Sequence, residues 1–378
     1  MSRSLRILHV SEAFGGGIVG VVAPLAERLA DAGHSVAVAY GVRPETPANV
    51  RNEVSPDVEV FPLPWHKRSM REQLSAAKAL RRLAAEWEPD VVHLHSSFAG
   101  VVGAMALGRR YTLVYSPHGY SFTRTSDPAP RRFAYRLAER YLARRVDVVA
   151  AVSESEARLA REAAHAPLVE VVPNGIPQLD PGATPEPLER PFARVAGMGR
   201  ADHQRQPDAA GRILSSVSDV AEVEWIGGGT PSDDGIRVLA SHGVNVTGWL
   251  EKDEARERLA NATAYLHWSA WDGRSLAVLE AMAHDVVVVA SDIEPNREIL
   301  SPLQICSSEE EAAQLLRAVV TDEAVRERLL ADQRERREGF SAMEMAAEWE
   351  AVYTRAAARV DRGVILVAEA RADVSSAP

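Results

Sequence analysis

The feature of this sequence that most constrains its fold is an alternation of short apolar runs with longer helical patterns. The runs have the length and residue types of buried strands: residues 5–10, 35–40, 58–61, 90–94, 111–115 and 147–152, then 192–197, 222–226, 244–246, 264–267 and 286–290. Strands that alternate with helices favour a parallel sheet covered by helices on its faces. The sequence therefore predicts an α/β protein whose pattern occurs twice.

The chain has 378 residues, which exceeds the roughly 250–300 residues that one compact core usually holds. A proline-rich stretch separates the two halves of the pattern and is typical of a linker. We expect Rossmann-like, doubly wound domains at 1–176 and 192–339, with the linker at 177–191. An amphipathic helix follows near 341–358, and residues 361–378 are expected to form a flexible tail.

Several classes of protein are excluded by composition. Cys306 is the only cysteine, so neither an internal disulfide nor a cysteine metal cluster can form, and a reducing cytoplasm is the simplest compartment. No apolar run reaches the roughly 20 residues that span a bilayer. Residues 1–10 lack the pattern of a signal peptide. We expect a cytoplasmic protein that binds no nucleic acid.

A glycine-rich loop, Gly15-Gly16-Gly17, follows the first expected strand and opens the first helix. Glycines let the backbone approach a phosphate, and a helix start offers free N–H groups. With Gly20 the loop also fits a dinucleotide-binding fingerprint, which needs an acid at the end of the second strand. Tyr40-Gly41 occupies that place, and no carboxylate follows before Glu45. An anion-binding loop is favoured over an NAD site or a plain tight turn.

Two arginines follow the first strand of the second half. Gly199-Arg200 ends that strand and Arg205 lies five residues on. Ligands of doubly wound sheets bind at strand carboxyl ends, where two guanidinium groups could clamp a diphosphate. On spacing alone, arginines that simply face solvent remain the alternative.

The run from Trp271 to Ala283 passes from a glycine turn into an apolar helix. Asp272 precedes the helix, and Gly273, Arg274, Ser275 and Leu276 form its start. Glu280 lies inside the helix, where a buried carboxylate needs a partner such as a sugar hydroxyl. The alternative is that Asp272 caps the helix and Glu280 lies on the surface.

Over nearly its whole length the chain resembles the retaining glycosyltransferases of family 4, of the bacterial group 1 type, which have the two-Rossmann GT-B fold. The matching segments are Gly15-Gly16-Gly17, Ser116-Pro117-His118-Gly119, Val152-Ser153-Glu154-Ser155-Glu156, Pro173-Asn174-Gly175, Gly199-Arg200 with Arg205, Ile226-Gly227-Gly228-Gly229, Thr247-Gly248-Trp249 and Leu279-Glu280-Ala281-Met282-Ala283. The resemblance implies that the active site lies in the cleft between two domains. It also implies that residues 340–360 form a helix that crosses back to the first domain.

The resemblance further implies roles for single residues. Glu280 would hold the nucleotide ribose and Asp272 the donor sugar, while His118 would meet that sugar. Gly248 and Trp249 would border the base.

This chain departs from the family pattern at four places. Asp272 stands where Glu is usual, and Arg205 where Lys is usual. Arg274 and Ser275 replace an apolar residue and a Gly or Pro.

The expected chemistry follows from charge. Negative charge gathers on the leaving diphosphate, and Arg200, Arg205, the glycine-loop amides and the helix start near Ser275 would stabilise it. The resemblance implies retention of configuration, with the leaving phosphate taking the acceptor's proton. No cofactor and no metal are expected. The acidic pair Asp233-Asp234 is interpreted as part of a polar loop.

Residues 131–145 hold six arginines and one acid, with Phe133, Leu137 and Tyr141 on one helical face. Such a helix could lie on an anionic membrane at its cytoplasmic side, which would suit a lipid-linked acceptor in cell-wall or exopolysaccharide synthesis. An ordinary domain helix with solvated arginines is the alternative.

The sequence thus predicts a hexosyltransferase that moves a sugar from a nucleotide sugar, most simply a UDP-sugar. The acceptor would be a glycan, a lipid-linked molecule or a small molecule. A nucleotide-sugar epimerase of the same fold is the main rival. An NAD-dependent oxidoreductase and a non-catalytic nucleotide-sugar-binding protein are rivals of other classes.

Overall fold

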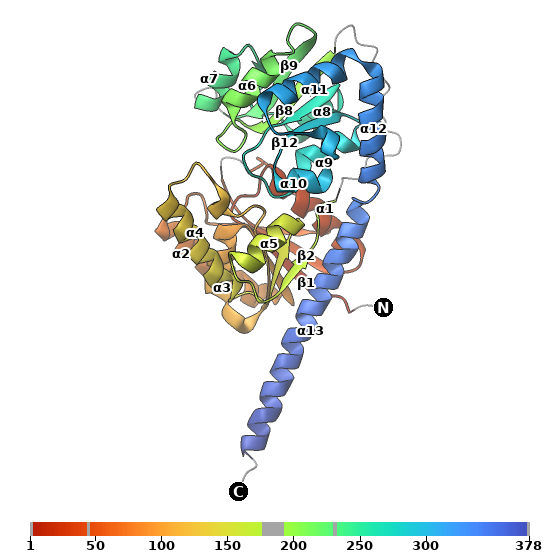
Figure 1. Ribbon diagram of the computed structural model, residues 1–378. Coiled ribbons are helices and arrows are strands. Elements are labelled where there is room, and N and C mark those ends of the chain that lie inside the picture. The colour runs from red at the N-terminus through yellow and green to blue at the C-terminus, as the bar shows by residue number, and fades with distance from the viewer. Residues whose placement is uncertain (1–2, 44–45, 176–192, 230–232, 376–378) are drawn as a thin grey trace. The chain divides into compact units, whose positions relative to one another are not determined.

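The computed structural model describes residues 3–43, 46–175, 193–229 and 233–375, with side chains described to residue 359. Contacts between residues divide the chain into two compact units (Figure 1). The first unit contains residues 1–122, 129–173 and 343–378, and the second contains 123–128 and 174–342. The segment from residue 343 onward thus groups with the first unit. The expected linker at 177–191 lies outside the described residues.

The first unit is built on a seven-stranded parallel sheet with the strand order β3-β2-β1-β4-β5-β6-β7. The strands are β1 (Arg6–Ser11), β2 (Ser35–Gly41), β3 (Glu59–Leu63), β4 (Val91–His95), β5 (Thr112–Ser116), β6 (Val148–Ala151) and β7 (Val169–Val171). The order reverses beside β1, as in a doubly wound Rossmann sheet. This confirms the expected fold class for the first half.

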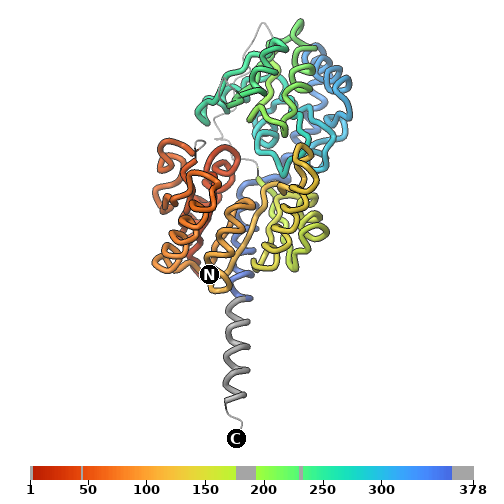
Figure 2. The backbone as a smooth tube through the Cα atoms, turned by 90° about the vertical axis from the view of Figure 1, so that its left-hand side faces the viewer, coloured from red at the N-terminus to blue at the C-terminus, as the bar shows by residue number. Residues whose placement is uncertain are grey.

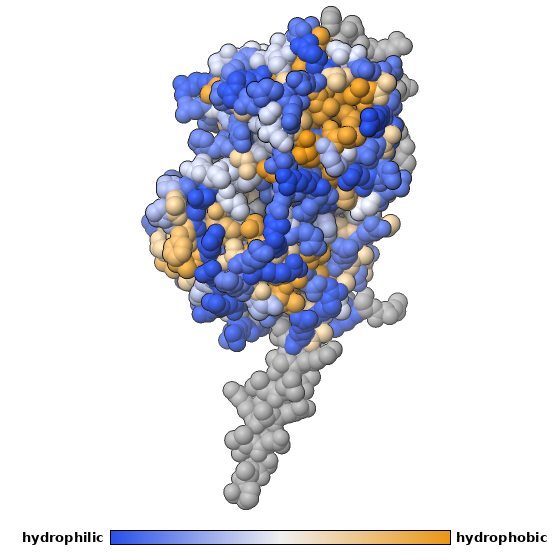
Figure 3. Space-filling view, viewed as in Figure 1, coloured by the Kyte–Doolittle hydropathy of each residue, from blue (hydrophilic) through white to orange (hydrophobic). Residues whose placement is uncertain are grey.

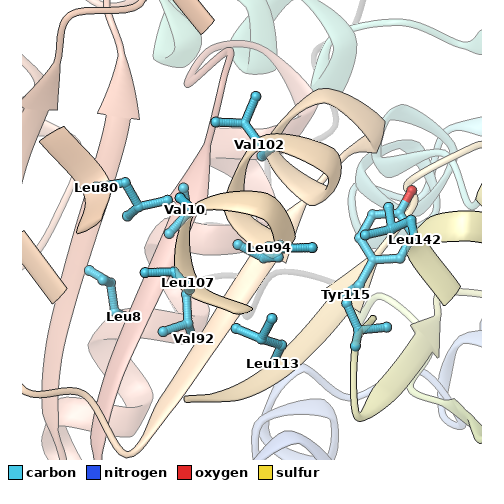
Figure 4. Packing of buried hydrophobic residues seen from close by; sticks show 14 of the residues in the cluster. Leu8, Val10, Leu80, Val92, Leu94, Val102, Leu107, Leu113, Tyr115 and Leu142 are labelled. Atoms are coloured by element: carbon cyan, nitrogen blue, oxygen red, sulfur yellow. The ribbon is translucent and has the colours of Figure 1, made fainter. Parts of the chain in front are cut away.

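Helices cover both faces of this sheet because its strands are apolar on both sides. They are α1 (Gly17–Asp31), α2 (Met70–Trp87), α3 (Ser97–Leu107), α4 (Ala129–Ala143), α5 (Glu154–Glu162) and α13 (Ala342–Ser375). On one face, Leu94 and Leu113 pack with Val102 and Leu107 of α3 and with Leu142 of α4 (Figure 4). Gly103 permits this close approach, since a Cβ there would lie 2.3 Å from the Leu94 side chain.

The other face is covered by α1 and by the start of α13 (Figures 1 and 2). Trp349 and Tyr353 of α13 are fully buried against β-strand residues such as Ile7 and Val91. The backbone of α13 continues to Ser375, through residues that the sequence assigned to a flexible tail. The expected flexibility of residues 361–378 stays a prediction.

The second unit contains a six-stranded parallel sheet with the order β10-β9-β8-β11-β12-β13. Its strands are β8 (Ala193–Arg200), β9 (Ala221–Gly228), β10 (Asn245–Val246), β11 (Ala264–His267), β12 (Val287–Ser291) and β13 (Ile305–Cys306). Its helices are α6 (Pro207–Ser215), α7 (Asp234–Ser241), α8 (Lys252–Ala260), α9 (Leu276–Ala283), α10 (Glu294–Ile299), α11 (Glu309–Thr321) and α12 (Glu323–Arg337). The sequence analysis did not predict α7, α10 or β13.

The core of the second unit fixes the carboxyl ends of its central strands. Trp225 of β9 is buried, and its indole N–H donates to the Gly199 carbonyl at 2.9 Å. A Cβ on Gly197 would lie 2.4 Å from the Trp225 ring, so only glycine fits there. These contacts hold the end of β8, where Gly199 and Arg200 were expected to bind ligand. Among the described residues, no helix is long and apolar enough to cross a membrane.

Candidate active site

A cluster of polar side chains lies at the carboxyl end of β11. Arg205 Nη1 donates to Asp272 Oδ2 at 2.7 Å and also to the Ser269 hydroxyl. His267 Nε2 lies 3.3 Å from both Arg205 Nη1 and Asp272 Oδ2, and the Tyr265 hydroxyl bonds His267 Nδ1 at 3.0 Å. The structure therefore brings together Arg205 and Asp272, which the sequence had assigned to separate parts of the donor.

Electrostatics keep Arg205 and Asp272 ionised within this cluster. Burial alone would raise the pKa of Asp272, but the Arg205 charge and the His267 hydrogen bond outweigh it and hold the pKa below its usual value. Burial opposes the charge of Arg205, yet the Asp272 carboxylate raises the Arg205 pKa overall. Burial and the neighbouring Arg205 lower the pKa of His267. The cluster is a buried ion pair beside a neutral imidazole.

Arg200 occupies a different environment from Arg205. Its side chain is 68% exposed, and its Nε lies 3.9 Å from Asp202 Oδ2. Gly199 just before it has φ +118°, which favours glycine. Arg205 is 16% exposed. Of the two expected clamp arginines, one is therefore held in place and the other faces solvent.

Trp249 presents an exposed ring beside the end of β9. Its exposed fraction is 55%, which is high for so large an apolar side chain. Thr247 Oγ1 accepts from the Gly227 N–H at 2.9 Å, and Gly248 forms an isolated antiparallel bridge to Gly227. This backbone arrangement fixes the loop that carries Trp249, which has the exposure expected of a surface that stacks on a base.

The start of α9 is tied to the Asn174 turn through Arg274. The Arg274 Nε donates to the Asn174 carbonyl at 3.1 Å, and the Asn174 side chain donates to the Arg274 carbonyl at 3.2 Å. The guanidinium lies 4.5 Å from the Phe340 ring centroid, and burial lowers the Arg274 pKa to about 10. This departure from the family pattern thus has partners of its own, which the sequence did not predict.

The neighbouring residues are arranged around the same turn. Asp272 Oδ1 accepts from the Gly273 N–H at 2.9 Å, and Ser275 is the buried N-cap of α9 without a side-chain cap bond. Leu276 begins the helix. Asp272 is therefore not the cap residue of this helix, which was one alternative.

Glu280 is 13% exposed and has a protein partner. The Arg256 Nε, from α8, donates to Glu280 Oε1 at 3.0 Å. The carboxylate therefore does not lie free on the surface, and its charge is balanced by Arg256. A ribose contact of Glu280 stays a prediction.

In the first unit, the glycine loop leads directly into α1. Gly16 is the N-cap residue with φ +53°, and Gly17 is the first helical residue. A Cβ on either residue would meet nothing within 4 Å, so the backbone there borders open space. Gly15 precedes them. The positive φ of Gly16 explains the glycine by conformation, and the open space leaves room for an anion.

His118 sits in a loop after β5 with φ +52°, a value uncommon outside glycine. Glu156 of α5 anchors this loop, because its Oε1 accepts from the Gly119 N–H at 2.6 Å and its Oε2 from the Val152 N–H at 2.9 Å. This gives the Ser155-Glu156 segment a structural role. His118 Nε2 lies 2.9 Å from His95 Nδ1.

Sequence analysis missed the histidines behind His118. His9, His93 and His95 are fully buried on one face of neighbouring strands β1 and β4. The alternation of His93 and His95 in an otherwise apolar strand was the signal that could have revealed them, since i and i+2 side chains share a face. His267 at the end of β11 was not predicted either.

Within the described ranges, one group of three potential metal ligands lies close together, and it is this histidine trio, with nitrogen atoms within 4.8 Å of one another. Both nitrogens of His93 already have partners, Tyr353 OH at 2.8 Å and Ser116 Oγ at 2.9 Å. The trio is therefore better described as hydrogen-bonded than as a metal centre.

The sequence predicted that Asp233 and Asp234 lie in a polar loop, and this prediction was wrong. Asp233 is the N-cap residue of α7 and Asp234 its first residue, paired with Arg237. Acidic residues at a helix start are stabilised by the helix dipole, which explains the difference.

Two parallel sheets of this topology define the GT-B class of glycosyltransferases. Sucrose-phosphate synthase from Thermosynechococcus elongatus matches with a TM-score of 0.77 and 18% identity, over 93% of this chain and 99% of that one. Anabaena HepE in complex with UDP-glucose matches with a TM-score of 0.73 and 16% identity, over 93% and 100% of the two chains. At these identities the likeness shows the fold.

A model for Glycosyltransferase Family 4 matches residues 15–178, and a model for Glycosyl transferases group 1 matches residues 196–322. Together they cover most of both units, and the chain belongs to the family 4, group 1 glycosyltransferases.

Two curated relatives extend this comparison. An uncharacterized 41.2 kDa protein in the cps region of Klebsiella pneumoniae is 26% identical over 56% of this chain, and the alignment spans 63% of that relative's length. The phosphatidyl-myo-inositol mannosyltransferase of Mycolicibacterium smegmatis is 25% identical over 76% of this chain and 75% of its own.

Proposed function

We propose that this glycosyltransferase uses a UDP-sugar and transfers the sugar with retention of configuration to an acceptor hydroxyl. The observation that carries the proposal is the polar set at the strand ends of the second unit. Arg205 and Asp272 follow the neighbouring strands β8 and β11, and the exposed Trp249 follows β10, which β9 separates from β8. The HepE structures, in complex with UDP and with UDP-glucose, support UDP as the nucleotide.

Each residue then has a defined task. Trp249 stacks on the base beside Gly248. Glu280 binds the ribose, and part of its contact with Arg256 is lost when it does so. Arg205, Arg200, the Gly199 backbone and the helix start at Gly273–Leu276 bind the diphosphate, together with the Gly15–Gly17 amides of the first unit. Asp272 and His118 contact the sugar.

The reaction breaks the bond between the anomeric carbon and the β-phosphate oxygen. The acceptor oxygen bonds to the same face of that carbon, and its proton passes to the leaving phosphate. Charge that gathers on the phosphate is met by arginines that stay protonated, so we propose that no metal is needed. Transfer in excess EDTA tests this point. Activity that EDTA abolishes and Mg²⁺ or Mn²⁺ restores would contradict it.

We propose further that the acceptor is lipid-linked and that α4 faces an anionic membrane. Phe133, Leu137 and Tyr141 are 59%, 47% and 41% exposed on one face of α4, among arginines. Figure 3 shows apolar surface among hydrophilic residues in this region. Arg140, Arg144 and Arg145 line a hollow of about 500 Å³ next to Leu137 and Tyr141. The mannosyltransferase relative, named for phosphatidyl-myo-inositol, supports such an acceptor.

The decisive experiment incubates the full chain with a panel of UDP-sugars and measures UDP release, with and without a membrane lipid extract as acceptor. Acceptor-dependent release, with the α-anomer of the donor retained in the product, supports the proposal. Interconversion of the UDP-sugar without any acceptor would indicate an epimerase instead. Co-sedimentation with vesicles that contain anionic lipid, for the wild type and Leu137→Glu, tests the membrane surface separately.

A further inference from the structure

Three imidazoles form one chain of hydrogen bonds from the His118 loop into the core of the first unit. His118 Nε2 lies 2.9 Å from His95 Nδ1, and His95 Nε2 lies 3.0 Å from His9 Nδ1. The rings of His118 and His95, and those of His95 and His9, are stacked at 5.2 and 5.3 Å. His95 and His9 are fully buried.

The three hydrogen-bonded imidazoles hold a fixed number of N–H protons when all three are neutral. A neutral imidazole carries one N–H, and a hydrogen bond between two ring nitrogens holds one proton. Burial lowers the pKa of His9 to about 3 and that of His118 to about 4, and it holds the pKa of His95 well below its usual value. All three rings are therefore neutral near pH 7. Two of their three N–H protons lie in the two hydrogen bonds between the rings. The third must lie on an outer nitrogen, either of His9 or of His118.

The inner end decides which end holds the third proton. His9 Nε2 is buried and has no hydrogen-bond partner among the residues that the structure describes. A buried N–H without an acceptor is rarer in proteins than an acceptor that lacks a donor. The inner end therefore carries the lone pair. It follows that His9 donates from Nδ1 to His95 Nε2, and that His95 donates from Nδ1 to His118 Nε2.

We infer that His9 and His95 are positioning residues that hold His118 in one tautomer, with its proton on Nδ1. His118 then offers a neutral N–H donor at its free ring edge. One part of this inference rests on the proposed function, namely that the His118 N–H binds an oxygen of the donor sugar. The tautomer itself does not depend on that function. A neutral donor can bind a sugar oxygen without competing with Arg205 for the diphosphate charge.

His93 is buried beside these three histidines but takes no part in the hydrogen bonds that join them. Its nitrogens bond Tyr353 of α13 and Ser116, whose hydroxyl donates to the Ala150 carbonyl at 2.8 Å. Tyr353 therefore offers a matched control. Tyr353→Phe removes a buried hydroxyl from the same layer and leaves the bonds of His95 intact.

Nitrogen NMR of the full chain labelled with ¹⁵N-histidine reads the tautomers directly, and His118→Asn assigns the His118 signals. We expect His118 to be protonated at Nδ1 and bare at Nε2, with no change between about pH 6 and 8. His95→Phe should yield a mixture of His118 tautomers and lower kcat by about 10- to 100-fold, as loss of an orienting partner does elsewhere. In His95→Asn, the amide can reach the place of Nδ1, so this variant should keep much of the His118 tautomer preference and much of kcat. Tyr353→Phe should change neither.

A proton on His118 Nε2 in the wild type would overturn the inference. So would an unchanged His118 tautomer in His95→Phe, or one metal ion per chain found by elemental analysis and lost in His9→Phe. The NMR result needs no substrate. If the protein shows the expected His118 tautomer but turns over no UDP-sugar, the proposed function is refuted and the positioning role of His9 and His95 is not.

Discussion

The two units bury polar groups beside their strand ends in opposite ways. In the second unit, Arg205 and Asp272 form an ion pair 2.7 Å long that stays charged. In the first unit, burial lowers the pKa values of His9 and His95 and keeps both rings neutral, and one hydrogen bond joins the two rings. Under the proposed function, the second unit would supply charge to the leaving phosphate, and the first unit would supply an uncharged, oriented hydrogen-bond donor.

The largest expected effect comes from the charge of the second unit. Arg205→Ala should lower turnover by about two to four orders of magnitude, as the loss of a preorganised charge stabiliser worth roughly 3–5 kcal/mol does. Arg200→Ala should fall at the lower end of that range, because solvent screens an exposed charge. Steady-state kinetics measure both. Arg212→Ala, an exposed ion-paired arginine on α6, is the control. If Arg205→Ala and Arg212→Ala were equally mild, the clamp would be misplaced.

The next effect separates the two acids of the donor site. Glu280→Ala should mainly raise KM, because the ribose is held alike before and during reaction, whereas Asp272→Ala should mainly lower kcat. Arg256→Ala removes the partner of Glu280 and leaves the carboxylate. If Arg256→Ala raised KM as much as Glu280→Ala, the effect would belong to the ion pair and not to a ribose contact.

Trp249 offers a smaller test of the same unit. Base stacking on an aromatic ring is worth roughly 1–3 kcal/mol, so Trp249→Ala should weaken UDP binding by about 5- to 150-fold. Trp249→Phe should retain most of the affinity. Calorimetric titration with UDP measures both variants. Because the ring is exposed in the structure, the free energy of unfolding should hardly change, and a large loss of stability would show that the ring is packed instead.

The fold and the site were predictable to different degrees. The doubly wound sheets were predictable from apolar runs that alternate with helical patterns. Glycine-containing loops such as those at Gly16 and Gly199 were also predictable, and both glycines have the positive φ values that favour glycine. The pairing of Arg205 with Asp272 does not follow, because residues 67 positions apart meet only once β8 and β11 lie side by side.

The histidine chain shows the same limit. A histidine in an apolar strand is ordinary, and its meaning depends on which strands are neighbours. His9 meets His95 because β1 pairs with β4. Likewise Arg274 was visible as a departure from the family pattern, but its partners Asn174 and Phe340 come from distant segments.

The last predicted effect is a pH dependence of stability that arises in the first unit. Between about pH 3 and 6.5 the unfolded chain binds a proton at His9 that the folded protein does not, so stability falls as the pH falls from 6.5. The slope is about 1.4 kcal/mol per pH unit for each such histidine. Glu139 opposes it, because burial raises the pKa of Glu139 to about 7 and the folded form keeps that proton.

Urea unfolding at pH 5, 6 and 7 measures this slope. Glu139→Gln removes the opposing group and should make the loss of stability on acidification steeper. The ion pair of the second unit should contribute nothing here, since Asp272 stays charged throughout this range. A stability that rose on acidification in Glu139→Gln would contradict the neutral histidines.

The proposed function requires that this chain bind a nucleoside diphosphate through its second unit. Calorimetric titration of the full protein with UDP, GDP, ADP and NAD in excess EDTA tests it most directly. We expect UDP to bind best, with a dissociation constant below millimolar, and Arg205→Ala to weaken this binding. If none of the three diphosphates binds more tightly than millimolar while NAD does, the proposed function is wrong and the protein is better described as an NAD-dependent oxidoreductase.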